Sequence, residues 1–368
     1  MKAVFHNIFY KIISLLVAVA SIFGYSGECL KADSSEWNTN YKYVFVHGLM
    51  GWGSYDAANK IMPYWGMFGG SLMKYLCDKG FDCYAASVAP TSSAWDRACE
   101  LYAQLTGTVV DYGEAHSKEC GHERFGEDFT GRALIDSWSA KDKINLLGHS
   151  FGGATVRVFA SMMETGSDAE KAATKASELS DFFKGGKGDW IYSVTSLAAP
   201  HNGTTAYNAG DGSEEIGAKD TAAYDMYIDN ALELNKTVIT YSDTYYFSIA
   251  CDATQKNPDG TYSPVTSKME PIFISSSKEI GALTGVTKGG YVIDETWQRN
   301  DGLVNTVSAL APSSAPTTEY DADNVKTGVW NIMPVYDGDH MALQGGLMKP
   351  NDVTDFYVEH LSMINKLK

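Results

Sequence analysis

Short apolar runs alternate along the chain with longer segments whose apolar positions recur at helical spacing. Buried strands are predicted at residues 43–46, 83–88, 143–147, 191–198 and 245–250. Helices are predicted over residues 71–77, 95–105, 152–163 and about 353–367. Strands that alternate with helices form a mainly parallel central sheet covered on both faces, so we expect an α/β fold. The proline-containing stretch 312–318 predicts a surface loop.

The first thirty residues have a pattern of their own. Lys2 and Lys11 lie near an apolar run over residues 12–20, which is typical of a secretory signal peptide and short for a membrane span. We therefore predict a signal peptide over residues 1–30, a secreted protein, and a single domain over residues 31–368. An uncleaved membrane anchor is the alternative.

Composition narrows the classes of partner. Acidic residues number 45 and basic residues 29 among 368, a net charge of -16 at pH 7. This excess disfavours a sequence-wide affinity for nucleic acid or anionic lipid. The chain has no uncharged apolar run of about 18 residues, which excludes a multi-spanning membrane protein. The six cysteines do not make a disulfide scaffold in a chain of this length, although Cys77 and Cys83 are close enough in sequence to pair.

The segment GHSFG at residues 148–152 fits the pattern G-x-S-x-G and lies between a predicted strand and a predicted helix. A sharp strand-to-helix turn strains the serine backbone, the glycines relieve crowding, and the hydroxyl is presented at the helix N-terminus. Ser150 is therefore predicted to be a nucleophile; the alternative is a turn whose serine only caps the helix. Acyl transfer also needs N–H donors for an oxyanion, and we predict those of Phe151 and of Leu49, in the turn after the first strand.

The general base should be a histidine that comes last in the chain order Ser–acid–His. His340, which follows a turn late in the chain, fits this order best. His47 and His201 lie early for it. His360 falls in the last predicted helix, where a surface or packing role is expected.

The acid that orients the base should lie on a loop between Ser150 and His340. Asp301, in the loop 299–305, is the predicted residue. Asp294 and Asp339 are weaker alternatives. Asp339 adjoins the histidine in sequence, which gives poor geometry for orienting its ring.

Several segments resemble the zinc-containing true lipases of Gram-positive bacteria, in their thermostable and staphylococcal branch. The matching segments are HGLMGWG at 47–53, YWG at 64–66, WDRACE at 95–100, VDYGEAH at 110–116, APHNGTT at 199–205, NDGLVN at 300–305 and DH at 339–340. They appear in family order over most of the chain. The resemblance implies an α/β-hydrolase fold and the triad Ser150, Asp301 and His340.

The resemblance also implies a metal site in a small extra region of the domain. Asp96, His116, His122 and Asp225 match the family's zinc ligands. Two imidazoles and two carboxylates suit a tetrahedral zinc with no open position, which implies a structural ion. Taken singly, Asp96 could instead interact with a helix dipole, and the histidines could be solvated loop residues.

Two departures from the family pattern affect the expected activity. Only the 15 residues 206–220 follow the segment 199–205, without an apolar helical stripe, so the lid that the family carries there is expected to be missing. Residues 341–347 (MALQGGL) lack the acids of the family's calcium site, so that site is expected to be lost.

These features predict a secreted carboxylic-ester hydrolase that works through an acyl-enzyme. An open cleft would suit short- or medium-chain esters in water, and bulky or polymeric esters. The alternatives are a metallohydrolase, although the chain has no H-E-x-x-H motif, a binding protein on a hydrolase scaffold, and an acyltransferase with the same triad. The sequence predicts neither the acyl-chain length nor the oligomeric state.

Overall fold

A seven-stranded sheet forms the centre of the computed structural model, which describes residues 34–207 and 219–368. Its strands, in spatial order, are β13 (Thr317–Glu319), β14 (Trp330–Ile332), β7 (Tyr245–Ile249), β6 (Ile191–Leu197), β5 (Ile144–His149), β1 (Lys42–Val46) and β2 (Cys83–Ala86). Every neighbouring pair is parallel. The predicted α/β fold is confirmed.

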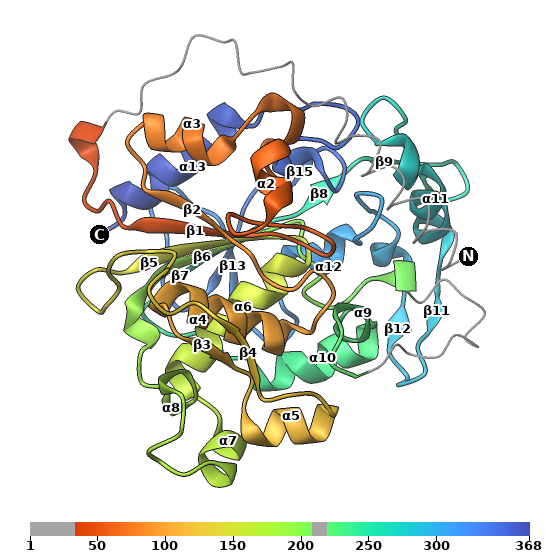
Figure 1. Cartoon of the computed structure of the whole chain (residues 1–368). Helices are drawn as coiled ribbons and strands as arrows, with labels where there is room; N and C mark the ends of the chain where they lie inside the picture. The colour runs from red at the N-terminus through yellow and green to blue at the C-terminus, as the bar shows by residue number, and fades with distance from the viewer. Residues whose placement is uncertain (1–33, 208–218) are drawn as a thin grey trace.

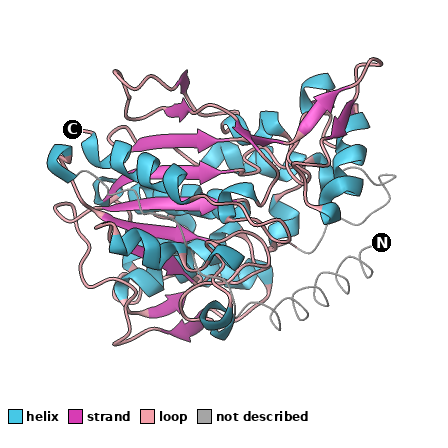
Figure 2. Cartoon of the chain, turned by 90° about the horizontal axis from the view of Figure 1, so that it is seen from above, coloured by secondary structure: helices cyan, strands magenta, loops and turns pink. Residues whose placement is uncertain are grey.

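Helices cover both faces of this sheet. Helices α3 (Leu72–Asp78) and α13 (Thr354–Lys366) lie on one face, and α4 (Ala94–Thr106) and α6 (Phe151–Thr165) lie on the other (Figures 1 and 2). In β1, Tyr43 and Phe45 pack into the hydrophobic core between the sheet and helices α3 and α13. Val44 and Val46 pack into the core between the sheet and helices α4 and α6. Because both faces of a parallel sheet are buried, its strands read as continuous apolar runs, and this made them predictable.

The predicted helices and strands are all present, with bounds that differ by at most two residues. The stretch 312–318, predicted to be a surface loop, needs correction at its end. Its last two residues begin β13, where Thr317 pairs with Trp330 and Thr318 with Asn331. A three-residue edge strand is too short to show an alternating pattern.

Shorter elements surround the sheet. The remaining helices are α2 (Ala57–Ile61), α5 (Glu114–Cys120), α7 (Asp168–Ala173), α8 (Asp181–Lys184), α9 (Ala222–Asp225), α10 (Ile228–Thr237), α11 (Ile274–Ala282) and α12 (Thr306–Leu310). Within the described residues, four strand pairs lie outside the main sheet: β3 (Val109–Asp111) with β4 (Phe125–Asp128), β8 (Cys251–Asp252) with β15 (Tyr336–Asp337), β9 (Thr254–Lys256) with β10 (Tyr262–Pro264), and β11 (Gly285–Val286) with β12 (Val292–Ile293).

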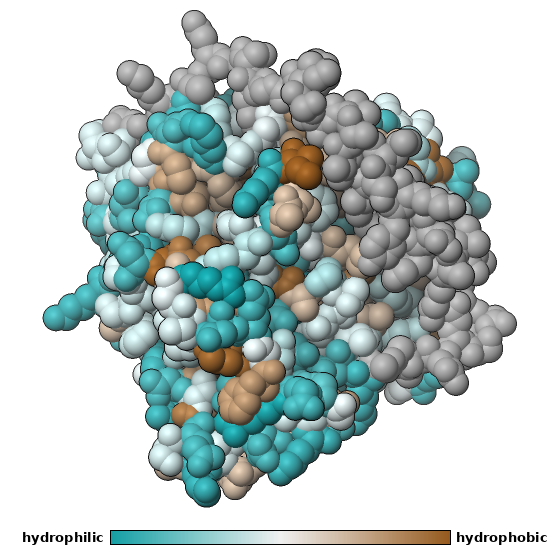
Figure 3. Space-filling view, viewed as in Figure 1, coloured by the Kyte–Doolittle hydropathy of each residue, from teal (hydrophilic) through white to brown (hydrophobic). Residues whose placement is uncertain are grey.

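The possible pairing of Cys77 with Cys83 is not formed. Both are free thiols, and the Cys77 Sγ lies 3.7 Å from the carbonyl oxygen of Cys83. The predicted signal peptide over residues 1–30 lies outside the described residues. Within the described ranges, no helix combines the length and apolar character that a membrane crossing requires. The described residues visible in Figure 3 are mostly hydrophilic, with apolar residues scattered among them.

Candidate active site and metal cluster

Ser150 occupies the turn between β5 and α6 in a strained backbone conformation. Its φ of 56° and ψ of -130° are unusual for a residue with a side chain and cost roughly 1–3 kcal/mol. The Ser150 N–H donates to the carbonyl of Leu197 at 2.8 Å, which fixes the turn. Two glycines make room for it: a Cβ at Gly48 would lie 2.7 Å from the Ser150 Cβ, and one at Gly152 would lie 2.2 Å from the carbonyl oxygen of Val46.

The structure brings Ser150, His340 and Asp301 into one hydrogen-bonded chain. His340 Nε2 lies 2.8 Å from Ser150 Oγ, and His340 Nδ1 lies 2.8 Å from Asp301 Oδ2. All three side chains are buried. Because a carboxylate can only accept, Nδ1 carries the hydrogen and Nε2 is free to accept from the serine hydroxyl. This is the tautomer that a histidine needs to act as a base toward serine.

The loop that carries Asp301 holds its carboxylate in place. Asp301 Oδ1 accepts the N–H groups of Leu303 and Val304 at 3.0 and 2.7 Å, which leaves Oδ2 for the imidazole. The backbone N–H of His340 donates to the Asp301 carbonyl at 2.8 Å, so the two residues are also joined through their main chains.

His149, directly before the candidate nucleophile, connects two parts of the site. Its Nε2 lies 2.7 Å from the His340 carbonyl oxygen and its Nδ1 lies 2.6 Å from the Tyr64 hydroxyl. Since a carbonyl only accepts, Nε2 carries the hydrogen and the Tyr64 hydroxyl donates to Nδ1. The same hydroxyl accepts the Gly48 N–H at 3.1 Å. Burial lowers the pKa of His149 to about 3, so the ring stays neutral.

Both predicted oxyanion donors come from segments next to Ser150: Phe151 follows it in the chain, and Leu49 follows Gly48, which approaches the Ser150 side chain. In the described part of the chain, neither the N–H of Leu49 nor that of Phe151 donates a hydrogen bond, so both are free to bind an oxyanion. Arg97 supports both segments: its guanidinium donates to the carbonyl of His47 and lies 5.1 Å from the centre of the Phe151 ring. The Arg97 side chain is fully buried, and this burial lowers its pKa to about 10.

The histidines set aside as candidate bases, His47, His201 and His360, are buried in the fold. The His47 Nε2 accepts the Val88 N–H at 3.2 Å, and the His201 Nε2 lies 2.8 Å from the Ser196 hydroxyl. His360 is buried beside Thr195 rather than exposed.

Neither alternative acid contacts the imidazole of His340. The Asp294 side chain caps a short turn by accepting the Thr296 N–H. Asp339 accepts the N–H groups of Glu270 and Met341. Burial, together with the nearby Glu270 and Asp301, raises the pKa of Asp339 to about 6.

The loop after His340 is secured by one carboxylate and one ammonium group. The buried Glu270 Oε1 accepts the N–H groups of Leu347, Met348 and Lys349 at 2.7–2.9 Å. The Lys349 Nζ donates to the carbonyls of Thr266 and Met269 at 2.8 and 2.9 Å. These contacts join residues 266–270 to the loop that follows His340.

A second cluster of polar side chains gathers around helix α5. The His116 Nε2 lies 3.1 Å from Asp96 and 3.2 Å from Asp220, and the His122 Nε2 lies 3.2 Å from Asp220 and 3.9 Å from Asp96. Three of the four predicted metal ligands, Asp96, His116 and His122, are therefore together.

The fourth predicted ligand needs correction. Asp225 forms no ion pair with either imidazole; its Oδ2 accepts the N–H of Ala94, in the first turn of α4, at 2.8 Å. Asp220 stands in its place, with a left-handed φ of 69° and its carboxylate held by the Ser93 hydroxyl at 2.5 Å. The sequence could not distinguish two carboxylates five residues apart, because only the turn before α9 decides which one faces the histidines.

The chemistry of this cluster fits a zinc ion. Two imidazoles and two carboxylates are ligands that zinc accepts. The His122 Nε2 is buried and makes no hydrogen bond, which leaves a lone pair for a metal. Although burial opposes it, the carboxylates of Asp220 and Asp96 raise the pKa of His116 to about 9, so the cluster strongly favours a positive charge.

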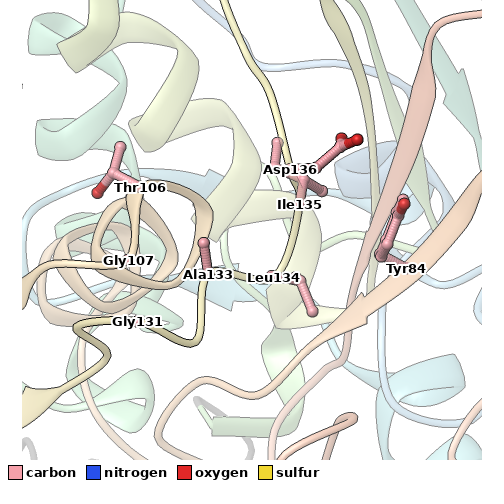
Figure 4. Close-up of a pocket in the computed structure, with 8 residues that line it drawn as sticks. All are labelled: Tyr84, Thr106, Gly107, Gly131, Ala133, Leu134, Ile135 and Asp136. Atoms are coloured by element: carbon pink, nitrogen blue, oxygen red, sulfur yellow. The ribbon is translucent and has the colours of Figure 1, made fainter.

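A surface hollow of about 590 Å³ lies apart from both clusters. It is lined by Tyr84, Thr106, Gly107, Gly131, Ala133, Leu134, Ile135 and Asp136 (Figure 4). Tyr84 lies near the start of β2, whereas Ser150 follows the carboxyl end of β5. The hollow therefore lies near the amino ends of the strands, whereas the candidate active site lies at their carboxyl ends.

Comparisons with known proteins identify the family of the chain. A family model described as "Lipase-like, C-terminal domain" matches residues 39–217 and 209–360. Lipase 2 of Staphylococcus aureus is 31% identical over 361 residues, which cover 86% of this chain and 52% of the relative. The chain thus spans about half the length of the curated relatives it matches.

Solved structures give the same result over a larger share of the chain. EstA from Clostridium botulinum has a TM-score of 0.83 and 29% identity, covering 97% of this chain and 98% of that one. The Staphylococcus hyicus lipase has a TM-score of 0.79 and 26% identity, covering 92% and 99%. The chain belongs to the lipase-like family that includes the staphylococcal lipases.

Proposed function

We propose that the protein is a carboxylic-ester hydrolase of the lipase and esterase type, in which Ser150 forms an acyl-enzyme. The observation that carries the proposal is the hydrogen-bonded chain from Ser150 through His340 to Asp301, with 2.8 Å at each contact. Its position supports the proposal too, because parallel α/β sheets bind ligands at the carboxyl ends of their strands.

The proposed reaction follows from the tautomer of His340. Its Nε2 takes the proton of the Ser150 hydroxyl as the oxygen attacks the ester carbonyl, and Asp301 stabilises the resulting imidazolium. The N–H groups of Leu49 and Phe151 bind the oxyanion. His340 then protonates the leaving alcohol, and it deprotonates the water that hydrolyses the acyl-enzyme.

A zinc ion is proposed as a structural component of the enzyme. Asp96, His116, His122 and Asp220 would hold it, which corrects the predicted set at one position. When bound, the ion would cross-link α4, α5 and the segment before α9, and its binding free energy would add to the stability of the fold. The chemistry at Ser150 requires no step at this ion.

We further propose a secreted enzyme with an open cleft. Residues 1–30 support secretion, and the short connection from Thr205 to Thr221 supports the absence of a lid, although residues 208–218 lie outside the described ranges. Without a lid, esters dissolved in water would reach Ser150 directly. Short- and medium-chain esters, and bulky or polymeric esters, are the proposed substrates.

Hydrolysis of a chain-length series of soluble esters by the purified protein tests this proposal. Ser150→Ala should lower turnover by about 10⁶-fold and leave the fold intact, while Ser54→Ala, at an exposed serine, should retain full activity. Substantial turnover by the Ser150→Ala variant would contradict the proposal. Addition of competing alcohols would reveal an acyltransferase by transesterification.

A further inference from the structure

Helix α5 presents a third metal-binding side chain beside the two histidines. Cys120 follows His116 by four residues, so the two side chains lie on one face of the helix. The Cys120 Sγ lies 3.9 Å from the His116 Nδ1. Ligand atoms from His116, Cys120, His122 and Asp220 all lie within 4.8 Å of one another. The thiol therefore belongs to the same cluster as the imidazoles.

The backbone explains how Cys120 and His122 can face one site. Cys120 is the last residue of α5, and Gly121 ends the helix with a left-handed φ of 81°. This turn reverses the chain direction, so His122 returns toward the helix that it follows. A Cβ at Gly121 would meet no atom within 4 Å, so the glycine is needed for its conformation rather than for space.

Nothing else in the described part of the chain uses the Cys120 thiol. Cys120 is a free cysteine of intermediate exposure, and its contact with His116 is the sole hydrogen-bond-range contact of its Sγ there. The buried His122 Nε2, which makes no hydrogen bond, is an independent sign that the cluster is built to bind a ligand.

We propose that Cys120 is a metal ligand, which makes the centre a mixed site of thiolate, two imidazoles and carboxylate. The inference requires the proposed metal site but not the proposed ester hydrolysis. As the ion binds, the Cys120 S–H bond breaks, a sulfur–metal bond forms and the proton leaves to water. No oxidant or reductant is involved.

A thiolate ligand changes which ions the site prefers. With Cys120, five donor side chains compete for a tetrahedral ion, and the thiolate takes the place of one carboxylate. Sulfur favours soft and borderline ions, whereas an all-oxygen and nitrogen set is more tolerant of hard ions. We therefore expect selectivity for zinc, cobalt and cadmium over manganese and calcium.

Cobalt substitution tests the proposal through a spectroscopic readout that is independent of activity. The full-length apoprotein is loaded with one equivalent of Co²⁺, and its absorption spectrum is recorded. Wild type should show a thiolate-to-cobalt charge-transfer band in the near ultraviolet, besides the visible bands of tetrahedral cobalt. Cys120→Ser should lose the charge-transfer band and keep the visible bands. Cys77→Ser, at an exposed thiol of α3 on the other side of the molecule, should keep both (Figure 1).

Cadmium binding provides the second measurement. In competition with zinc, Cys120→Ser should lose cadmium affinity by about tenfold or more relative to wild type. Visible cobalt bands without a charge-transfer band in wild type would overturn the role of Cys120 while leaving the metal site intact. Failure of wild type to retain cobalt at all would overturn both. Because the wild-type spectrum decides the matter, a variant that fails to fold does not prevent the test.

Discussion

Ser150 is held in its strained backbone conformation by contacts that sequence neighbours cannot supply. Its N–H is bound by Leu197 on the adjacent strand β6, and Gly48 on β1's following turn approaches its Cβ. Strain of this kind persists only where surrounding structure imposes it. The contacts leave the hydroxyl facing His340, which is why the strain is consistent with a nucleophile.

Hydrogen bonds run from Gly48 through Tyr64 and His149 to His340, and they connect the turn that carries Leu49 to the general base. Tyr64→Phe should break this connection. The variant leaves the Gly48 N–H and the His149 Nδ1 without partners. Each unsatisfied buried group costs about 1–3 kcal/mol. We expect denaturant titrations to give a lower free energy of unfolding for this variant. We also expect kcat to fall by a larger factor than KM changes.

Tyr55→Phe is the matched control for that variant. The Tyr55 hydroxyl donates to the Arg132 carbonyl in an exposed hydrogen bond, so its loss should change neither quantity by much. If Tyr64→Phe were as stable and as active as Tyr55→Phe, the connection through His149 would have no role in the site.

The candidate triad could be predicted from the sequence, whereas its supports could not. A local motif predicts Ser150, and the order of residues along the chain and their positions in turns predict Asp301 and His340. Tyr64 and Arg97 carry no such mark, because their roles depend on hydrogen bonds between segments that only the folded sheet brings together. A buried arginine is indistinguishable in the sequence from a solvated one.

Helix α5 depends on its neighbours for stability. It spans only seven residues, a length at which an isolated helix is unstable in water. Its side chains His116 and Cys120 face the cluster, and Glu170 of α7 accepts the N–H groups of Ala115 and His116 in its first turn. A bound ion would therefore stabilise an element that has little intrinsic stability.

Two substitutions separate the corrected ligand from the predicted one. Asp220→Asn removes a carboxylate that contacts both imidazoles, so zinc affinity should fall by about 100-fold or more. Asp225→Ala removes an acceptor for the first turn of α4 and should cost about 1 kcal/mol of stability with zinc affinity unchanged. Metal titration and denaturant unfolding of both variants measure these effects. The reverse pattern would restore Asp225 as the ligand.

At the scale of the whole molecule, buried histidines determine how stability depends on pH. Burial lowers the pKa of His47 and His149 to about 3, that of His360 to about 4, and that of His201 well below its usual range. The unfolded chain, with histidine pKa values near 6.5, therefore binds more protons below pH 6.5. These four histidines should make stability rise with pH up to about 6.5, above which their own contribution levels off.

Three buried carboxyls act in the opposite direction. Burial raises the pKa of Glu100 to about 7 and the pKa values of Asp225 and Asp339 to about 6, so their contributions to stability fall as pH rises through this range. Four histidines outweigh three carboxyls, and the net slope of stability against pH stays positive between pH 5 and 6.5.

Replacement of one buried histidine tests the pH dependence. His360→Gln removes one proton-binding group that contacts Thr195, Phe247 and Phe356, none of them a member of the candidate triad, and it can keep the contact with Thr195. The slope of unfolding free energy against pH should decrease by about 1 kcal/mol per pH unit between pH 5 and 6. Denaturant titrations across this range measure it. An unchanged slope would mean that His360 already binds a proton when folded.

The proposed absence of a lid predicts simple kinetics on dissolved esters. Turnover should follow a hyperbola in substrate concentration and show no jump where the ester begins to form droplets. Activity measured across the solubility limit, with an ester of intermediate chain length, checks this. A sharp increase at that limit would indicate interfacial activation and a closed cleft in water.

The central sheet could be predicted because its strands are buried on both faces, as in Val44 and Phe45 of β1. The peripheral pairs β8 with β15 and β11 with β12 could not, because two-residue strands have no periodicity. Asp220 was missed for a related reason: a turn at positive φ, and not a repeating pattern, directs its carboxylate toward the histidines.

Covalent labelling with a fluorophosphonate tests the proposed acyl-enzyme most directly. The reagent mimics the ester carbonyl and reacts only with an activated serine. Mass spectrometry of the labelled protein should find one adduct per chain, on the peptide that contains Ser150, and an ester substrate should slow its formation. Active protein that remains unlabelled, or that carries the adduct on a different residue, would show that Ser150 is not the nucleophile.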